Sequence, residues 1–382
     1  MDRFLKVVNN KLINGLGEEV VLRGVNLGGW LVQESWMCPV SGEDRKWANL
    51  DTLNVLEERF SEKEVQEILD TYQDHWITEV DIKNISEMGC NVLRVPFWYR
   101  NFMKNEDGTW INENLDENPG FKRLDWVIDT AEKYGMYVIL DMHGCPGGQS
   151  MDHCCGTLEE NRLYTDVVCQ ESMKKLWLAI SDRYKENSTV AAYDIMNEPQ
   201  NNSGYTGENS YDPWEQKSWE MTNQIYDSMI KAIRETGDNH VITAEGIWRV
   251  TNLPNPKEKG WTNMMYQTHL YDDDEGFKKW VNEMAETMDK YGVAGYIGEF
   301  QNLNGIQMCD EHNINWTTWT YKGTNNDIGT FFCYFANIPR VDVKKDSLET
   351  IKAKWGEKIE TTNFVEKSDV IESIKASAQK KC

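Results

Sequence analysis

The chain has 382 residues, of which 40% are hydrophobic, and a formal net charge of −23 at pH 7. These values describe a globular protein with a large core, and the acidic excess argues against nucleic acid and anionic membranes as partners, because both bind clustered Lys and Arg. No apolar stretch reaches the roughly 18 residues of a membrane span. The 16 Trp and 16 Tyr outnumber the 11 Phe, so the aromatic residues with a polar group are in excess.

The N-terminal ten residues lack the apolar stretch of a signal peptide. The nine Cys residues show no CxxC pair, which argues against a disulfide framework and against structural zinc. Dinucleotide, P-loop and GxSxG motifs are also missing. We expect a monomer without metal or cofactor. We expect it in the cytoplasm, or secreted if a signal precedes these residues in the native protein.

Short runs of apolar, β-branched and aromatic residues recur along the chain and predict strands. The predicted strands are 20–26, 92–97, 137–141, 191–196, 240–244, 264–269, 295–298 and 315–320. Apolar residues at helical spacing predict helices between and after them. The predicted helices are 78–88, 124–134, 160–185, 214–235, 275–291, 347–355 and 367–378, while 248–261 is expected to be irregular.

Eight strands alternating with helices predict an α/β fold, a parallel (β/α)8 TIM barrel, as one catalytic domain over residues 1–382. An open doubly wound sheet is the alternative. Residues 6–22 predict a short hairpin that closes the bottom of the barrel, where Phe4 and Leu12 would pack. Residues 44–75 predict a helical insertion after the first strand. The loops at 30–76 and 145–159 are expected to be long βα loops that close part of the cleft.

Polar and aromatic side chains follow each predicted strand. In a barrel, the carboxyl ends of the strands meet on one face, where the active site forms. The candidate residues at these ends are Asn26, Trp30, Glu34, Arg94, Trp98, Asp141, His143, Asn197, Glu198, Glu245, Trp248, His269, Tyr271, Glu299 and Trp319. The sequence therefore predicts a pocket that combines carboxylates, imidazoles, one guanidinium and aromatic rings.

Two of these carboxylates, Glu198 and Glu299, suit glycoside hydrolysis. That reaction needs one acid to protonate the leaving oxygen and a second carboxylate as nucleophile or base. Arg94 could pair with Glu299, while Glu198 needs a raised pKa to hold its proton. The aromatic rings Trp30, Trp98, Trp248 and Trp319 could stack on the apolar faces of sugars.

Other interpretations of the same residues stay open. His143, His269, Asp141 and Glu245 could hold the metal of a hydrolase. The aromatic excess would also suit a carbohydrate-binding protein without chemistry. A single Trp at a strand end is in general more often a packing residue than a sugar platform.

Several motifs resemble those of glycoside hydrolase family 5, which belongs to clan A and includes cellulases and exo-β-1,3-glucanases. They are RGVNLGGW at 23–30, LRVP at 93–96, DMHG at 141–144, NEP at 197–199, GEF at 298–300, His269 with Tyr271, and Trp319. They follow the family's order over residues 20–322.

The resemblance implies a retaining mechanism with Glu198 as acid/base and Glu299 as nucleophile. It implies that Arg94 and Tyr271 orient Glu299 and that Asn197 binds the sugar 2-hydroxyl. His143 and His269 would complete the subsite that holds the cleaved sugar, and Trp319 would form its floor.

The run RGVNLGGWLVQESWM at 23–37 resembles the start of exo-β-1,3-glucanases, which implies that Glu34 holds the terminal glucose. The loop after the third strand is also similar, except for Cys145, Cys154 and Cys155. The predicted function is an exo-type β-1,3-glucosidase acting on a β-glucan or glucoside. An endo-β-1,4-glucanase or a lipid-linked β-glucoside hydrolase is the alternative.

Overall fold

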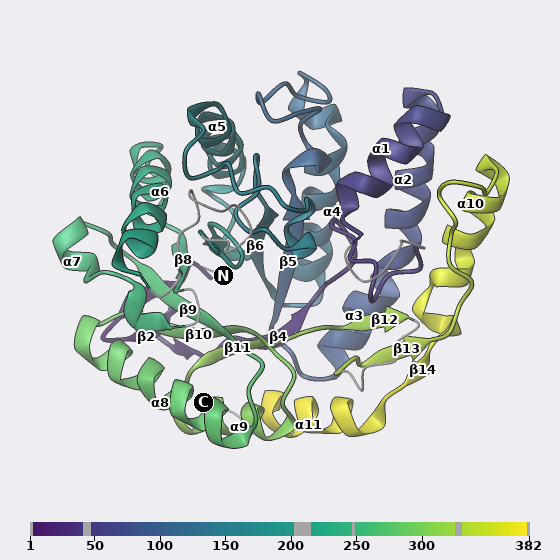
Figure 1. The fold of residues 1–382 in the computed structure, drawn as a ribbon. Helices are drawn as coiled ribbons and strands as arrows, with labels where there is room; N and C mark the ends of the chain where they lie inside the picture. The colour runs from purple at the N-terminus through teal and green to yellow at the C-terminus, as the bar shows by residue number, and fades with distance from the viewer. Residues whose placement is uncertain (1–2, 41–46, 202–214, 247–248, 325–330, 380–382) are drawn as a thin grey trace.

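A computed structural model describes residues 3–40, 47–201, 215–246, 249–324 and 331–379. Eight parallel strands close into a barrel in the order β10-β11-β4-β5-β6-β7-β8-β9 (Figure 1). The barrel strands are β4 (Arg23–Asn26), β5 (Val92–Trp98), β6 (Tyr137–Gly144), β7 (Val190–Asp194), β8 (Val241–Glu245), β9 (Met264–Leu270), β10 (Ala294–Phe300) and β11 (Asn315–Thr318). The closed order confirms the predicted barrel and rules out an open doubly wound sheet.

The strand register brings the polar strand ends to one level. Asn26 lies beside Arg94 across β4 and β5, and Asp141 lies beside Asp194 across β6 and β7. Glu299 pairs with His269 only after the register of β10 and β9 shifts past Ile297. Such an irregularity re-aims a side chain at the end of a strand.

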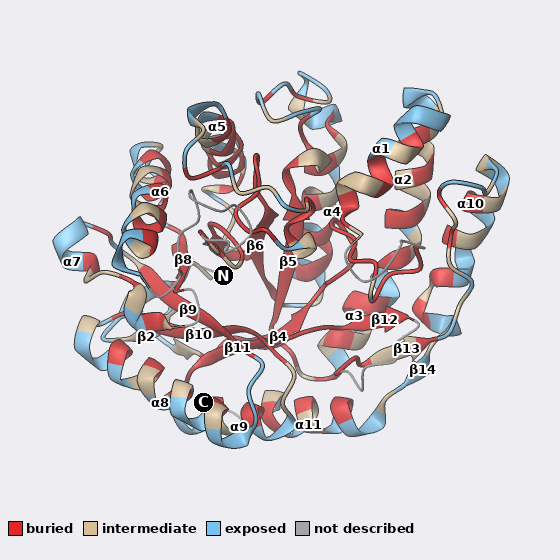
Figure 2. Ribbon diagram, viewed as in Figure 1, coloured by how far each residue is buried: buried red, intermediate tan, exposed pale blue. Residues whose placement is uncertain are grey.

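Helices surround the barrel, and their inner faces are buried against the strands or against neighbouring helices while their outer faces are exposed (Figure 2). They are α1 (Asn49–Arg59), α2 (Glu62–Trp76), α3 (Glu79–Glu87), α4 (Pro119–Lys133), α5 (Val167–Tyr184), α6 (Gln216–Glu235), α7 (Pro256–Lys259), α8 (Asp274–Tyr291), α9 (Leu303–Glu311), α10 (Leu348–Trp355) and α11 (Ser368–Ala378). None of the helices in the described ranges is both long and apolar enough to cross a membrane.

A small antiparallel sheet closes the N-terminal end of the barrel. Its strands are β1 (Lys6–Val8), β2 (Lys11–Ile13) and β3 (Glu19–Val20). Leu5, Leu12 and Leu22 share a buried cluster with residues at the bottom of the barrel strands, such as Tyr137 and Met265. The predicted hairpin is therefore present, and a third strand is added to it. This third strand arises because the predicted strand 20–26 is divided in two: its first residue belongs to β3 and its last four form β4.

Several boundaries differ from the prediction. The insertion 44–75 forms α1 and α2, with residues 41–46 outside the described ranges. Helix α5 begins only at Val167, because the Asp166 side chain caps the Val168 amide and ends the preceding loop. Helix α9 was not predicted. Nor was a third sheet of β12 (Lys322–Thr324), β13 (Tyr334–Ala336) and β14 (Val365–Glu366), whose parallel and antiparallel pairs join distant segments.

Candidate active site

Arg94, from the middle of β5, is the centre of the site and is completely buried. Its guanidinium contacts the carboxylate or amide oxygens of five residues at 2.7 to 3.1 Å: Glu299, Asn197, Asp194, Asn26 and Asp141. Burial raises the pKa of Asp141 to about 7 and that of Asp194 to about 6, even though Arg94 opposes both shifts. The raised pKa values favour the neutral forms of Asp141 and Asp194, so the negative charge that Arg94 faces from these two residues and Glu299 is reduced.

Glu299 is held on both of its oxygens. Arg94 Nη1 donates to Oε1 at 2.7 Å, and the Tyr271 hydroxyl donates to Oε2 at 2.8 Å. No side chain fits at the preceding residue, Gly298, because a Cβ atom there would lie 2.1 Å from Gln267 Oε1. Two strong donors fix the carboxylate in one orientation, as a nucleophile requires.

Glu198 follows β7 on a strained backbone with φ of +40°. The Glu198 amide donates to Glu245 Oε2 at 2.7 Å, which stabilises this turn. Its own Oε1 lies 3.0 Å from His269 Nδ1, and Oε2 accepts from the Cys154 thiol at 3.7 Å. Burial is the main cause of a raised pKa for Glu198, which favours the protonated form that a general acid needs.

The two glutamates face each other across a short gap. One oxygen from each, together with a ring nitrogen of His269, lie within 4.8 Å of one another. Retaining glycosidases hold their carboxyl groups about 5–5.5 Å apart, and inverting enzymes hold them about 6.5–9.5 Å apart. The spacing of Glu198 and Glu299 therefore matches the shorter of these two separations, which suits direct attack by Glu299 on the sugar.

Both histidines of the site are buried and neutral. Burial lowers the pKa of His143 to about 4 and that of His269 to about 3. His143 Nδ1 lies 2.7 Å from Asp141, and its ring stacks on Trp319 with centroids 5.4 Å apart. Neutral imidazoles can each donate one hydrogen bond and accept another, so they can bind hydroxyl groups without adding charge.

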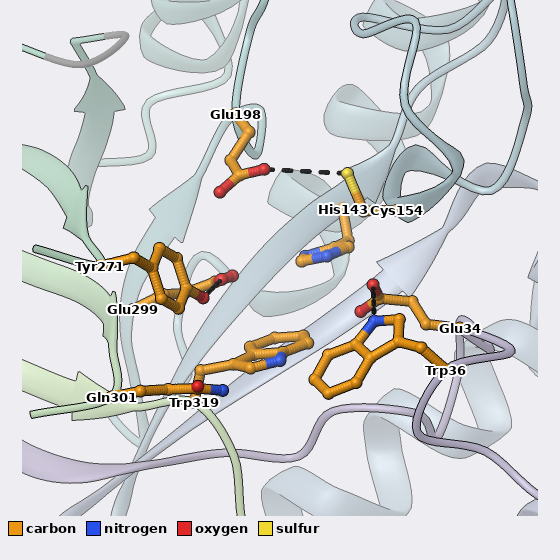
Figure 3. A pocket seen from close by; sticks show the side chains of 9 residues that line it. All are labelled: Glu34, Trp36, His143, Cys154, Glu198, Tyr271, Glu299, Gln301 and Trp319. Carbon is orange, nitrogen blue, oxygen red and sulfur yellow. Dashed lines mark hydrogen bonds between the residues drawn. The ribbon is translucent and has the colours of Figure 1, made fainter. Parts of the chain in front are cut away.

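The pocket above these residues has a volume of about 280 Å³ (Figure 3). It is lined by Glu34, Trp36, His143, Cys154, Glu198, Tyr271, Glu299, Gln301 and Trp319. Trp36 Nε1 donates to Glu34 at 2.7 Å. Burial, aided by the charges of Glu299 and Glu198, raises the pKa of Glu34 to about 8. The Nδ2 atom of Asn197 is buried without a partner among the described residues, so it can donate to a ligand.

The same atoms could in principle bind a metal, because Glu198, His269 and Glu299 each offer one ligand within 4.8 Å. A cation there would compete with Arg94 and Tyr271, which already occupy both oxygens of Glu299. Asp141 Oδ2 is likewise engaged by Arg94 and His143. Proton transfer and covalent catalysis fit this donor set better than metal ligation.

A sequence profile for the family described as "Cellulase (glycosyl hydrolase family 5)" matches residues 53–337 of this chain. The chain belongs to glycosyl hydrolase family 5. The family predicted from the NEP and GEF motifs is thereby confirmed.

Relatives of this family 5 chain carry several names. A protein named Beta-xylosidase from Phanerodontia chrysosporium is 25% identical over 370 residues, covering 85% of this chain and 71% of the relative. A Glucan 1,3-beta-glucosidase from Blumeria graminis is 27% identical over 258 residues, covering 65% of this chain and 55% of the relative. The structure of a rutinosidase from Aspergillus niger has the same fold, with a TM-score of 0.64 at 18% identity, covering 88% of this chain and 97% of that one. The family 5 chain thus spans about half the length of the glucosidase.

The structure brings most of the predicted site residues of this family 5 chain together around one pocket. They are Glu198, Glu299, Arg94, His143, Asn197, His269, Tyr271, Trp319 and Glu34. Trp248 lies outside the described residues. Three residues that line the pocket were not predicted as site residues: Trp36, Cys154 and Gln301. The sequence offered only their position as a signal, since Trp36 and Cys154 lie in predicted long loops and Gln301 directly follows a strand.

Two predicted sugar platforms are instead packing residues. Trp30 is 1% exposed, and its Nε1 donates to the Gln73 carbonyl while its ring contacts Trp126. Trp98 is 3% exposed and lies against Gly156, where an added Cβ would approach Trp98 Nε1 to 2.7 Å. Neither ring lines the pocket, so the prediction that they contact substrate is corrected. Their apolar surface is used to support the loops around the site.

We expect Arg94→Gln to lower both stability and activity of the family 5 chain. Loss of the guanidinium leaves buried carboxylates unpaired, which costs about 3–5 kcal/mol of unfolding free energy. Arg23→Gln is the matched control, because Arg23 pairs with Asp310 at 2.9 Å in a buried position away from the pocket. Urea unfolding should show a loss for both variants, while turnover per folded molecule should fall only for Arg94→Gln. Unchanged stability and turnover for Arg94→Gln would contradict its central role.

Proposed function

We propose that this family 5 chain is a retaining β-glucosidase that releases glucose from the ends of β-glucan chains, with β-1,3 linkages preferred. The observation that carries the proposal is the pair Glu198 and Glu299, which have oxygens within 4.8 Å of each other while Arg94 and Tyr271 hold Glu299. A protonated acid opposite a fixed carboxylate is the arrangement that double displacement needs.

In the first step, Glu299 attacks the anomeric carbon of the bound sugar. As the new ester bond forms, the bond from that carbon to the glycosidic oxygen breaks, and Glu198 gives its proton to the leaving oxygen. Arg94 and Tyr271 orient the attacking carboxylate. The free Nδ2 of Asn197 can donate to a sugar hydroxyl, and such bonds strengthen as positive charge develops on the ring.

In the second step, the ionised Glu198 takes a proton from water. The hydroxide attacks the anomeric carbon on the side opposite the ester, the ester bond breaks, and Glu299 is released as a carboxylate. Two inversions give net retention, and Glu198 ends the cycle protonated.

The preference for chain ends rests on the residues around one side of the pocket. Glu34 and Trp36 reach it from the loop after β4, and Cys154 reaches it from the loop after β6. A volume of about 280 Å³ suits a short sugar portion more than a long chain, since ligand pockets in general span about 300–1,000 Å³. The name of the Blumeria graminis relative supports the β-1,3 linkage.

A second candidate is a β-xylosidase, because the relative with that name aligns over 85% of this chain. A xylose lacks the hydroxymethyl group of glucose, so the two substrates differ in whether this group has to be accommodated by the pocket. Endo-β-1,4-glucanase activity is an alternative that the same assay separates, and a lipid-linked β-glucoside added to the substrates tests for a glucolipid hydrolase.

The test is product analysis over time on laminarin, lichenan and cellooligosaccharides, together with aryl β-glucoside and aryl β-xyloside. We expect glucose from laminarin at the earliest time points, with the longer chains shortened slowly. Early release of mixed oligosaccharides would show endo action, and faster cleavage of the xyloside would favour the second candidate. Tight glucoside binding without any release of phenol would contradict catalysis altogether.

A further inference from the structure

A cysteine lies beside the proposed acid/base. Cys154 lines the pocket, and its Sγ donates to Oε2 of Glu198 at 3.7 Å (Figure 3). The other oxygen of Glu198 faces His269 Nδ1 at 3.0 Å. The carboxyl group is therefore held between an imidazole and a thiol, one on each oxygen.

The loop presents this thiol through a tight turn. Residues His153–Cys155 form a short 3-10 helix that ends at Gly156 with φ of +84°. The neighbouring Cys155 is buried, and its Sγ contacts Thr157 and the carbonyls of Ser150 and Asp152 at 3.2 to 3.5 Å. Cys155 thus anchors the turn, and the adjacent Cys154 is left to face the pocket.

The surroundings keep the Cys154 thiol protonated. Burial is the main cause of its raised pKa, and the carboxylates of Glu198 and Glu34 add to it. His153 and Asp152 are the other titratable groups of the turn, and Asp152 acts in the same direction on Cys154. A neutral thiol is a donor, so it can stabilise the ionised form of a neighbouring carboxylate.

We propose that Cys154 is a positioning residue that holds the Glu198 carboxyl group and balances its acid and base roles. The thiol donates to Glu198 when Glu198 is ionised, which is the state that activates water in the second step. This inference rests on the proposed retaining function. The thiol itself makes no bond to the sugar and is not consumed.

The first experiment compares the variants Cys154→Ala and Cys154→Ser by the pH profile of kcat/KM on an aryl β-glucoside. Loss of the donor in Cys154→Ala should raise the pKa of Glu198. The basic limb of the profile, where kcat/KM falls because Glu198 loses its proton, should therefore move to higher pH by about 0.5 to 1 unit. Cys154→Ser keeps a hydroxyl donor and should restore the wild-type limb. Cys309→Ala, which removes a buried thiol from helix α9, is the control. An unchanged or lowered limb in Cys154→Ala would overturn the proposal.

A second experiment does not depend on hydrolysis. Among the described cysteines, Cys154 alone is not fully buried, so peptide mapping can follow its alkylation by iodoacetamide. At a pH above the raised pKa of Glu198, where that carboxyl group is ionised, replacing Glu198 with Gln removes the neighbouring negative charge and should speed this reaction roughly 3- to 10-fold. Equal rates in both proteins would show that the thiol and carboxyl groups do not interact. If wild-type protein cleaves no glycoside while this acceleration is seen, the contact stands and the proposed function fails.

Discussion

Replacing Glu299 with glycine is expected to stop hydrolysis, with kcat lower by on the order of 10⁴- to 10⁶-fold, as when a covalent nucleophile is removed from other enzymes. Without the carboxylate, no glycosyl-enzyme ester can form, and Arg94 and Tyr271 are left facing an empty space. The measurement is the initial rate of phenol release from an aryl β-glucoside. Glu275→Gln, an exposed position at the start of α8, is the control.

Azide distinguishes loss of the nucleophile from general damage to the fold. It can enter the space left in Glu299→Gly and attack the anomeric carbon once, so the product should be the α-glycosyl azide. Mass spectrometry and NMR of the product check both its identity and its configuration. Near-wild-type turnover by Glu299→Gly, or a β-glycosyl azide as its product, would contradict the assignment of Glu299.

Glu198→Gln is expected to lower kcat/KM by about 10²- to 10⁴-fold for substrates with poor leaving groups, since an amide cannot supply the proton. A dinitrophenyl leaving group needs little protonation, so its release in the first step should be much less affected. The contrast is measured with a series of aryl β-glucosides of increasing leaving-group pKa. A uniform loss across the series would contradict a role as general acid.

The pH profile gives an independent measure of the same residue. Burial raises the pKa of Glu198, and the acid must be protonated in the free enzyme. Activity of the wild-type protein should therefore be retained above the ordinary pKa range of a glutamate and be lost as pH rises through the raised value. In Glu198→Gln this basic limb should disappear.

The barrel could be predicted because each strand is an apolar run with its own polar end. Arg94, Glu198 and Glu299 each follow or interrupt such a run, and parallel strands of a barrel must bring those ends to one face. The third sheet could not be predicted in this way. Its pairs join Lys322–Thr324 to Tyr334–Ala336 and then to Val365–Glu366, and these short segments have no periodicity of their own.

The aromatic residues show the limit of local sequence most clearly. Trp30, Trp36 and Trp98 lie near strand ends and look equivalent in sequence. The structure buries Trp30 against α2 and Trp98 under the turn at Gly156, and it leaves Trp36 in the pocket with its Nε1 on Glu34. Which ring faces solvent depends on the packing of segments far away in the chain, and residue type alone does not contain that information.

The sequence by itself identified the two reacting groups, since Glu198 and Glu299 each lie in a short motif, NEP at 197–199 and GEF at 298–300. Their separation, the hold of Arg94 on Glu299, and the contact of Cys154 with Glu198 arise only from the closed barrel and its loops. Hydrophobic periodicity along the chain specifies local elements, whereas distances of a few ångströms between side chains depend on how strands and loops pack against one another.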